Sequence, residues 1–177
     1  MNALSSDELL KHAAQARRED RLSDACQNSK EAVRLSRLAG SRAALFRALM
    51  MLGQIERDED RLENALSPYE EAVSLSRQEG YLLRLAHTVR HLADLHLELS
   101  HLDLAASCYE EALALYRAEK RTVPLDLANA IRGFALLKDA RGQAEECRRL
   151  WEEARGLYLA VGVREGVEEC DARLSSR

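Results

Sequence analysis

Residues 69–80 read YEEAVSLSRQEG and residues 109–120 read YEEALALYRAEK, so a tyrosine, two glutamates and an alanine return after forty residues. The same pattern occurs earlier as SKEAVRLSRLAG at residues 29–40 and later as WEEARGLYLAVG at residues 151–162. Four copies at a nearly constant period are typical of stacked supersecondary units that bury their apolar faces against one another. The internal repeat therefore predicts an array of repeated units along most of the chain.

The composition indicates that these units are helical. Of the 177 residues 46% are apolar but only 5% are aromatic, and just two are prolines, so leucine and alanine dominate a chain that favours helix. The 26 basic and 30 acidic residues give a net charge of −4, which argues against nucleic-acid binding. Neither a secretory signal nor an apolar run of membrane-spanning length is present, so we expect a cytoplasmic protein that does not bind membranes.

Apolar residues recur at helical spacing in pairs of segments, so each copy is expected to form an antiparallel helix hairpin. We expect a single domain over residues 1–177, with repeats at about 5–40, 41–80, 81–122 and 123–162. A last amphipathic helix at about 163–174 is expected to cover the open apolar end of the stack. Pro68 falls within the expected fourth helix, which either starts late or is kinked near residues 64–66; the repeat favours the kink.

Three copies share a finer spacing of apolar, small and aromatic residues. Copy two has Leu49, Leu52, Gly53, Ala65, Tyr69 and Ala72; copy three has Val89, Leu92, Ala93, Ala105, Tyr109 and Ala112; copy four has Ile131, Phe134, Ala135, Cys147, Trp151 and Ala154. Copy one matches less well, with His12 and Ser29 at positions where large apolar residues are usual.

This spacing resembles the tetratricopeptide repeat over residues 5–162. The period of 40 to 42 residues, against the usual 34, is similar to the long-helix branch of that family, which includes repeats of kinesin light chains. The resemblance implies an all-α fold, a right-handed superhelical solenoid of four antiparallel helix hairpins with a C-terminal capping helix.

The resemblance also implies that the first helix of each hairpin lines a concave groove for a peptide or helix of a partner protein. Arginines would pair with the partner's carboxylates, and methionines and a leucine would supply adaptable apolar contact. A solvated helix face is the alternative interpretation. The candidate groove residues are Arg47, Met50, Met51, Gln54, His87, Arg90, His91, Asp94, Asn129, Arg132 and Leu136.

Other functions find less support in the sequence. His87 and His91, four residues apart and followed by Asp94, resemble a metal-binding face, but Arg90 beside them would repel a cation. No phosphate-binding glycine loop or nucleophile motif is present, so we expect a non-enzymatic interaction scaffold without a metal or cofactor. A self-assembling structural module is a further alternative, although the charged outer face favours a monomer or a weak homo-oligomer.

Overall fold

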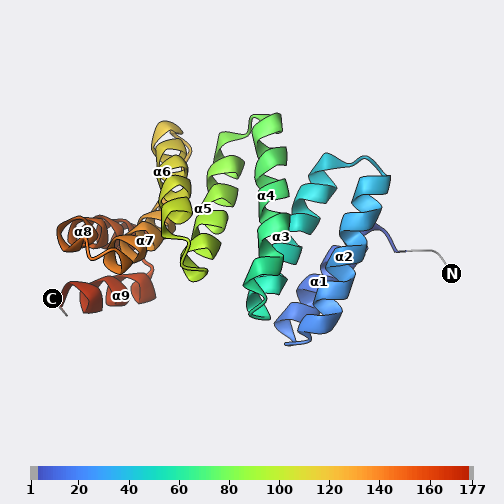
Figure 1. Cartoon of the computed structure of the whole chain (residues 1–177), viewed down its shortest axis with the longest axis horizontal. Coiled ribbons are helices and arrows are strands. Elements are labelled where there is room, and N and C mark those ends of the chain that lie inside the picture. The colour runs from blue at the N-terminus through green and yellow to red at the C-terminus, as the bar shows by residue number, and fades with distance from the viewer. Residues whose placement is uncertain (1–3, 176–177) are drawn as a thin grey trace. The chain divides into compact units, whose positions relative to one another are not determined.

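The computed structural model describes residues 4–175, and all regular secondary structure in that part of the chain is α-helical (Figure 1). The expected all-α class is therefore confirmed. The helices of the described residues are α1 (Ser6–Arg18), α2 (Leu22–Leu38), α3 (Arg42–Asp58), α4 (Leu62–Glu79), α5 (Leu82–Glu98), α6 (Leu102–Ala118), α7 (Pro124–Ala140), α8 (Ala144–Val161) and α9 (Arg164–Ser175).

The helices form two compact units. Unit 1 is Met1–Gly80 and holds the hairpins α1–α2 and α3–α4, and unit 2 is Tyr81–Arg177 and holds α5–α6, α7–α8 and α9. The turn inside each hairpin has one residue in the left-handed region, with φ between 57° and 69°, at a repeating position: Asp20, Asp60, Ser100 and Gly142. The repeat seen in the sequence thus extends to the backbone of the turns.

Local signals set several helix starts. The Ser5 hydroxyl accepts a hydrogen bond from the Glu8 amide while the Glu8 carboxylate accepts one from the Ser5 amide, which is a complete capping box for α1. Pro124 occupies the first turn of α7, where its missing N–H costs nothing. Pro68 lies inside α4, six residues after the helix begins, so the late start considered for that helix is wrong.

The core of unit 1 is built from the four helices α1, α2, α3 and α4. It consists largely of small residues packed around one buried aromatic side chain. Tyr69 is fully buried, and its ring lies against Gly53, where an added Cβ atom would come within 3.0 Å of the ring. Leu49 and Ile55 of α3 are also fully or almost fully buried. The glycine of the repeat pattern therefore lets the two helices of this hairpin approach each other around the tyrosine.

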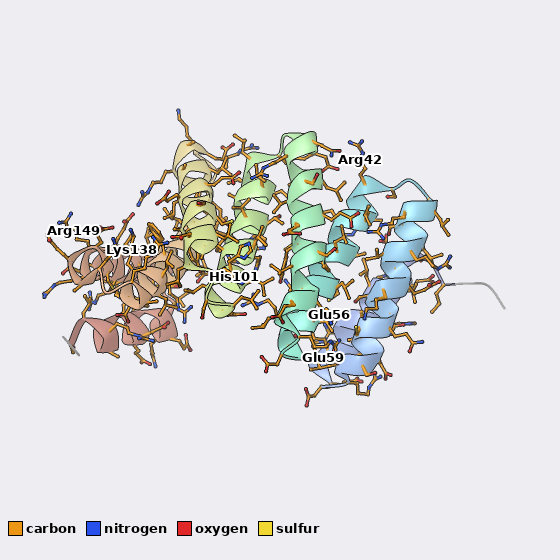
Figure 2. The ribbon with its side chains drawn as sticks, in the orientation of Figure 1. Arg42, Glu56, Glu59, His101, Lys138 and Arg149 are labelled. Carbon is orange, nitrogen blue, oxygen red and sulfur yellow. The ribbon has the colours of Figure 1, made fainter. Side chains whose placement is uncertain are left out.

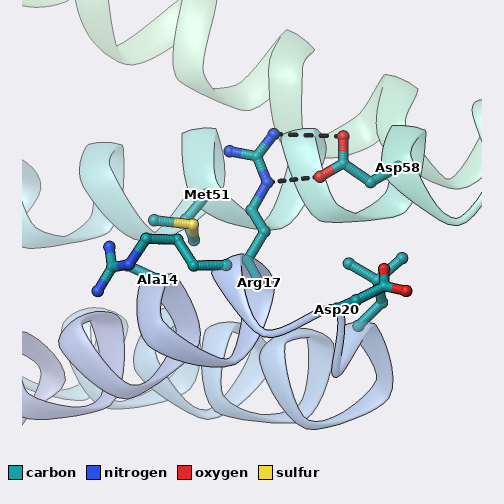
Figure 3. A pocket seen from close by; sticks show the side chains of 7 residues that line it. Ala14, Arg17, Asp20, Met51 and Asp58 are labelled. Carbon is teal, nitrogen blue, oxygen red and sulfur yellow. Dashed lines mark hydrogen bonds and ion pairs between the residues drawn. The ribbon is translucent and has the colours of Figure 1, made fainter.

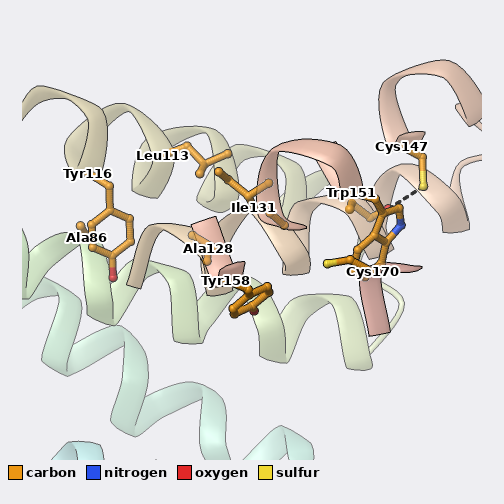
Figure 4. Close-up of a cluster of buried hydrophobic side chains, with 12 residues drawn as sticks. Ala86, Leu113, Tyr116, Ala128, Ile131, Cys147, Trp151, Tyr158 and Cys170 are labelled. Carbon is orange, nitrogen blue, oxygen red and sulfur yellow. Dashed lines mark hydrogen bonds between the residues drawn. The ribbon is translucent and has the colours of Figure 1, made fainter. Parts of the chain in front are cut away.

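The core of unit 2 contains a cluster of buried side chains from α5 to α9 (Figure 4). Trp151 is 1% exposed and Tyr158 is 2% exposed, and both belong to the same cluster as Cys170 of α9. Tyr158 lies against Gly166, where an added Cβ atom would be 2.5 Å from the ring. α9 packs on α8 and covers this aromatic cluster, which is the role expected of a capping helix.

Within each unit the first helices of the two hairpins contact each other directly. α1 contacts α3 and α5 contacts α7, whereas no comparable contact joins α2 with α4 or α6 with α8 in the described residues. The second helices are instead bridged by long side chains, as in the ion pair of Arg37 with Glu71 and that of Arg117 with Glu153. We call the side formed by α1 and α3, or by α5 and α7, the inner face of its unit.

Candidate functional site

The inner face of unit 1 contains a cavity of about 530 Å³ between α1 and α3 (Figure 3). Its lining combines a few apolar side chains with charged groups of both signs. The residues that line it are Ala14, Arg17, Arg18, Asp20, Leu22, Met51 and Asp58. Such a mixture can take an apolar side chain of a ligand while polar groups fix the ligand's orientation.

Arg17 is held rigidly at the side of this cavity. Its Nε donates to Asp58 Oδ2 at 2.5 Å and its Nη2 donates to Asp58 Oδ1 at 3.2 Å, which makes the ion pair bidentate. Its Nη1 donates to Gln54 Oε1 at 3.1 Å. The side chains of Arg17 and Asp58 are 37% and 34% exposed, so the ion pair is partly open to solvent and to a ligand.

The other expected groove residues of unit 1 have different environments. Arg47 is exposed, and its Nη2 donates to Asp7 Oδ1 of α1 at 2.6 Å. Met51 is half-buried and lines the cavity, whereas the Met50 side chain is 8% exposed and belongs to the core. Of the two methionines, Met51 is the one placed to contact a ligand in the cavity.

The inner face of unit 2 contains a connected polar network on α5. Arg90 Nη1 donates to Asp94 Oδ2 at 2.8 Å, and Arg90 Nη2 donates to His91 Nε2 at 2.7 Å. The Tyr109 hydroxyl of α6 donates a hydrogen bond to Asp94 Oδ1 at 2.6 Å, and His87 Nε2 lies 3.2 Å from His91 Nε2. Four of the expected residues are therefore brought together, and Asp94 is anchored by a tyrosine that the repeat pattern assigned only to packing.

The α7 residues of the same face are fixed by α8 and α9. Asn129 Oδ1 accepts a 2.7 Å hydrogen bond from the buried Tyr158 hydroxyl, and burial raises the pKa of Tyr158 to about 12. Arg132 donates from Nε and Nη2 to the two carboxylate oxygens of Glu169, at 2.6 and 2.8 Å, and this hydrogen bonding raises the pKa of Arg132. Leu136 is half-buried and packs against the unit 2 core.

Each arginine of the expected groove thus already has a carboxylate of its own chain. Arg47 pairs with Asp7, Arg90 pairs with Asp94, and Arg132 pairs with Glu169. A partner's carboxylate would have to share or displace these groups. That requirement could not be read from the sequence, because the pairs join residues that are 37 and 40 positions apart or depend on the rotamer chosen by Arg90.

The structure also bears on the metal-site alternative. Arg90 Nη2 lies 2.7 Å from His91 Nε2, so a cation already occupies the approach to that lone pair. In unit 1, Cys26, Glu56 and Glu59 have ligand atoms within 4.8 Å of one another, and the two glutamates lie at the C-terminal end of α3 (Figure 2). Lys30 and Arg61 supply the compensating positive charge there, so neither cluster has the unneutralised ligands that a metal requires.

Glu56 is the buried centre of that unit 1 cluster. Its side chain is 3% exposed, and its carboxylate accepts from Arg61 Nε at 2.6 Å and pairs with Lys30 Nζ at 3.1 Å. Burial alone would raise the pKa of Glu56, but hydrogen bonds from Arg61, Lys30 and Cys26 outweigh it and lower that pKa. The cluster therefore ties α2, α3 and the turn before α4 together.

Sequence reasoning missed the first repeat's share of the site. Arg17, Arg18, Asp20 and Leu22 line the cavity, but copy one matches the repeat pattern weakly and supplied no candidate. One signal was present. Arg17 precedes Asp58 by 41 residues, about one repeat, and an arginine and an aspartate one period apart on adjacent first helices can pair across the inner face.

The fold and its inner faces define an all-α protein built from repeated helix hairpins. The sequence profile of the tetratricopeptide repeat family matches residues 44–118, which run from the start of α3 to the end of α6. This match places residues 44–118 in the tetratricopeptide repeat family, and the solved structures described next share the fold over nearly the whole chain.

Three solved structures illustrate the similarity. BtubC (BKLC) from P. vanneervenii has a TM-score of 0.74 at 17% identity, over 96% of this chain and 78% of its own. The tetratricopeptide repeat sensor protein of the STAND ATPase class from Pyrococcus horikoshii has a TM-score of 0.87 at 16% identity, over 96% of this chain, which spans 26% of that protein. The TPR-like repeats of a kinesin light chain type protein from Podosopora anserina give 0.71 at 14% identity, over 95% and 92%.

At these identities the similarity establishes the fold, a tetratricopeptide-like helical solenoid. No curated protein matches the sequence. Among the described helices, none has both the length and the apolar character needed to cross a membrane.

Proposed function

We propose that the chain is a non-catalytic interaction module whose inner faces bind an extended segment or a helix of a partner protein. The observation that carries this proposal is the cavity of about 530 Å³ between α1 and α3, in which the half-buried Met51 lies beside the fixed guanidinium of Arg17. Family membership supports it, because tetratricopeptide repeats are in general protein-interaction scaffolds.

The binding mode follows from the chemistry of the cavity. Met51 and Ala14 would contact an apolar side chain of the partner, since methionine adapts its shape at low cost. Arg17 keeps Asp58 as its partner and would receive a carboxylate on its open edge, without losing its existing ion pair. The preferred ligand segment therefore contains a large apolar residue close to an acidic one.

A peptide-display selection against the purified chain tests this proposal. Selected peptides should bind native protein, and Met51→Lys should weaken binding at least about tenfold, which corresponds to about 1.4 kcal/mol. Leu38→Lys is the matched control, because Leu38 is 73% exposed on α2, away from the inner face of the same unit. If Leu38→Lys abolishes binding and Met51→Lys does not, the inner face of unit 1 is the wrong surface.

A further inference from the structure

Two histidines on the inner face of unit 2 meet through their Nε2 atoms. The rings of His87 and His91 are edge-on, with centroids 4.6 Å apart and Nε2 atoms 3.2 Å apart. Arg90 Nη2 lies 2.7 Å from the same His91 nitrogen. A guanidinium only donates hydrogen bonds, so His91 Nε2 must accept with its lone pair.

This geometry assigns the protons of both rings. Because His91 Nε2 accepts from Arg90, a neutral His91 carries its ring proton on Nδ1. The longer 3.2 Å contact is compatible with this state when His87 has its proton on Nε2, so that the two rings do not oppose lone pairs. A proton added to His91 Nε2 would remove the acceptor of Arg90 and place two cations in contact. The network as it stands therefore needs a neutral His91.

The groups around the pair act in both directions: burial and Arg90 favour neutral rings, whereas Asp94 and Asp126 favour protonation. Burial lowers the pKa of His87, the positive charge of Arg90 lowers it further, and only Asp126 of α7 opposes them. His91 Nδ1 lies 4.0 Å from Asp94 Oδ2, a distance from which an imidazolium would be drawn to the carboxylate. The titratable and charged groups facing the pair are Arg90 and Asp94 on α5, Tyr109 and Tyr116 on α6, and Asp126 on α7.

We propose that His87 and His91 form a proton-controlled latch, which holds Arg90 against Asp94 while both rings are neutral and releases the guanidinium when they are protonated. On release, His91 competes for Asp94, and the inner face of unit 2 gains positive charge together with a mobile arginine. Acidic partner segments then bind more tightly at low pH. This regulatory role rests on the proposed function of the inner face, whereas the latch itself can be tested without any partner.

Nuclear magnetic resonance of the imidazole and guanidinium nitrogens between pH 8 and pH 5 tests the latch directly. The expected result is an Nδ1–H tautomer for His91, an Nε2–H tautomer for His87, and an Arg90 signal that changes together with the imidazole titration. The exposed His12 of unit 1 supplies the matched control, because His12→Gln should leave the response of Arg90 to pH unchanged. A charged His91 at pH 7, or an Arg90 signal that is constant through the titration, would overturn the proposal.

A defined acidic probe tests the consequence for binding. An acetylated and amidated peptide of eight glutamates should bind about five- to tenfold more tightly at pH 5.5 than at pH 7.5, as expected for added charges near a surface. The double variant His87→Gln with His91→Gln keeps a hydrogen-bond acceptor for Arg90 and should show no such increase, while His12→Gln should behave like native protein. An equal increase in the double variant, or no binding at pH 5.5, would overturn the regulatory role.

The display selection and the magnetic resonance titration can fail independently of each other. If the display selection yields no ligand while the imidazole and Arg90 signals titrate together, the function of the inner face fails and the latch stands. If ligands are found but Arg90 does not respond to pH, the latch fails and the function stands.

Discussion

The substitution Gly133→Ala is expected to destabilise unit 2, although alanine is normally the better helix former. A Cβ atom at Gly133 of α7 would lie 2.5 Å from the Tyr109 hydroxyl oxygen and 2.7 and 2.8 Å from two ring carbons. Tyr109 is fully buried and cannot withdraw without giving up its 2.6 Å hydrogen bond to Asp94. The clash therefore acts on the network that holds the inner face of α5.

The expected change in the free energy of unfolding combines two destabilising effects and one stabilising effect. Overpacking in a core costs about 1 to 3 kcal/mol, and loss of a hydrogen bond to a charged group costs about 1.5 to 3 kcal/mol. Higher helix propensity returns about 1 kcal/mol. Gly133→Ala should thus lower the free energy of unfolding by about 1.5 to 5 kcal/mol, the sum of these effects.

Equilibrium urea denaturation followed by the fluorescence of the single tryptophan, Trp151 of unit 2, measures this change. Gly156→Ala is the matched control, because Gly156 lies in α8 with no atom within 4 Å of an added Cβ, and it should gain about 0.5 to 1 kcal/mol. In a Tyr109→Phe background the cost of Gly133→Ala should fall, since the hydroxyl is gone. Equal stabilisation by the two alanines would refute the packing described for Tyr109.

Three further substitutions test separate parts of the structure by urea denaturation, followed by circular dichroism for the unit 1 variants and for Trp151→Ala, which removes the fluorescent side chain. Trp151→Ala should cost about 3 to 5 kcal/mol because the side chain is 1% exposed in the unit 2 core, and an unchanged midpoint would contradict that burial. Pro68→Ala should stabilise α4 by about 1 to 3 kcal/mol by restoring an N–H donor for the Asn64 carbonyl; a loss would mean that packing of the proline outweighs the helix term. Glu56→Gln should cost about 2 to 4 kcal/mol at pH 7, because it removes the buried carboxylate that pairs with Lys30 and Arg61 and leaves Arg61 with Glu59 alone. Because the pKa of Glu56 is lowered on folding, the contribution of its charge is present above the unfolded pKa and is lost as pH falls through the folded value, so the difference between native and variant should shrink in acid; a constant difference would contradict this assignment.

The repeat in the sequence was sufficient for the fold, because it rests on local features. The period fixed by Tyr69 and Tyr109 predicted helix hairpins, and α1 to α8 are helices joined by short turns. Packing partners were harder to assign. Tyr69 fills the gap beside Gly53 of its own hairpin, but Tyr109 reaches Gly133 of the next one. The spacing alone does not distinguish these two cases.

The candidate site was harder to predict from the sequence than the fold. Whether a charged side chain is already paired depends on contacts between repeats. Arg132 was expected to pair with a partner's carboxylate, yet its guanidinium is held by Glu169 of α9. Met50 was expected to line the groove, and its side chain is in the core. The assignment of these residues to a binding surface remains a prediction. In unit 1 that prediction rests on Met51 and on the residues that line the cavity with it.

The proposal that a partner binds on the inner faces is tested most directly by mapping a display-selected peptide onto the chain through amide chemical-shift changes. Binding on an inner face should produce the largest chemical-shift changes on the first helices of the hairpins, which are α1 and α3 in unit 1 and α5 and α7 in unit 2. Changes concentrated on α2, α4, α6 and α8 would contradict it, because those helices form the opposite side of each unit.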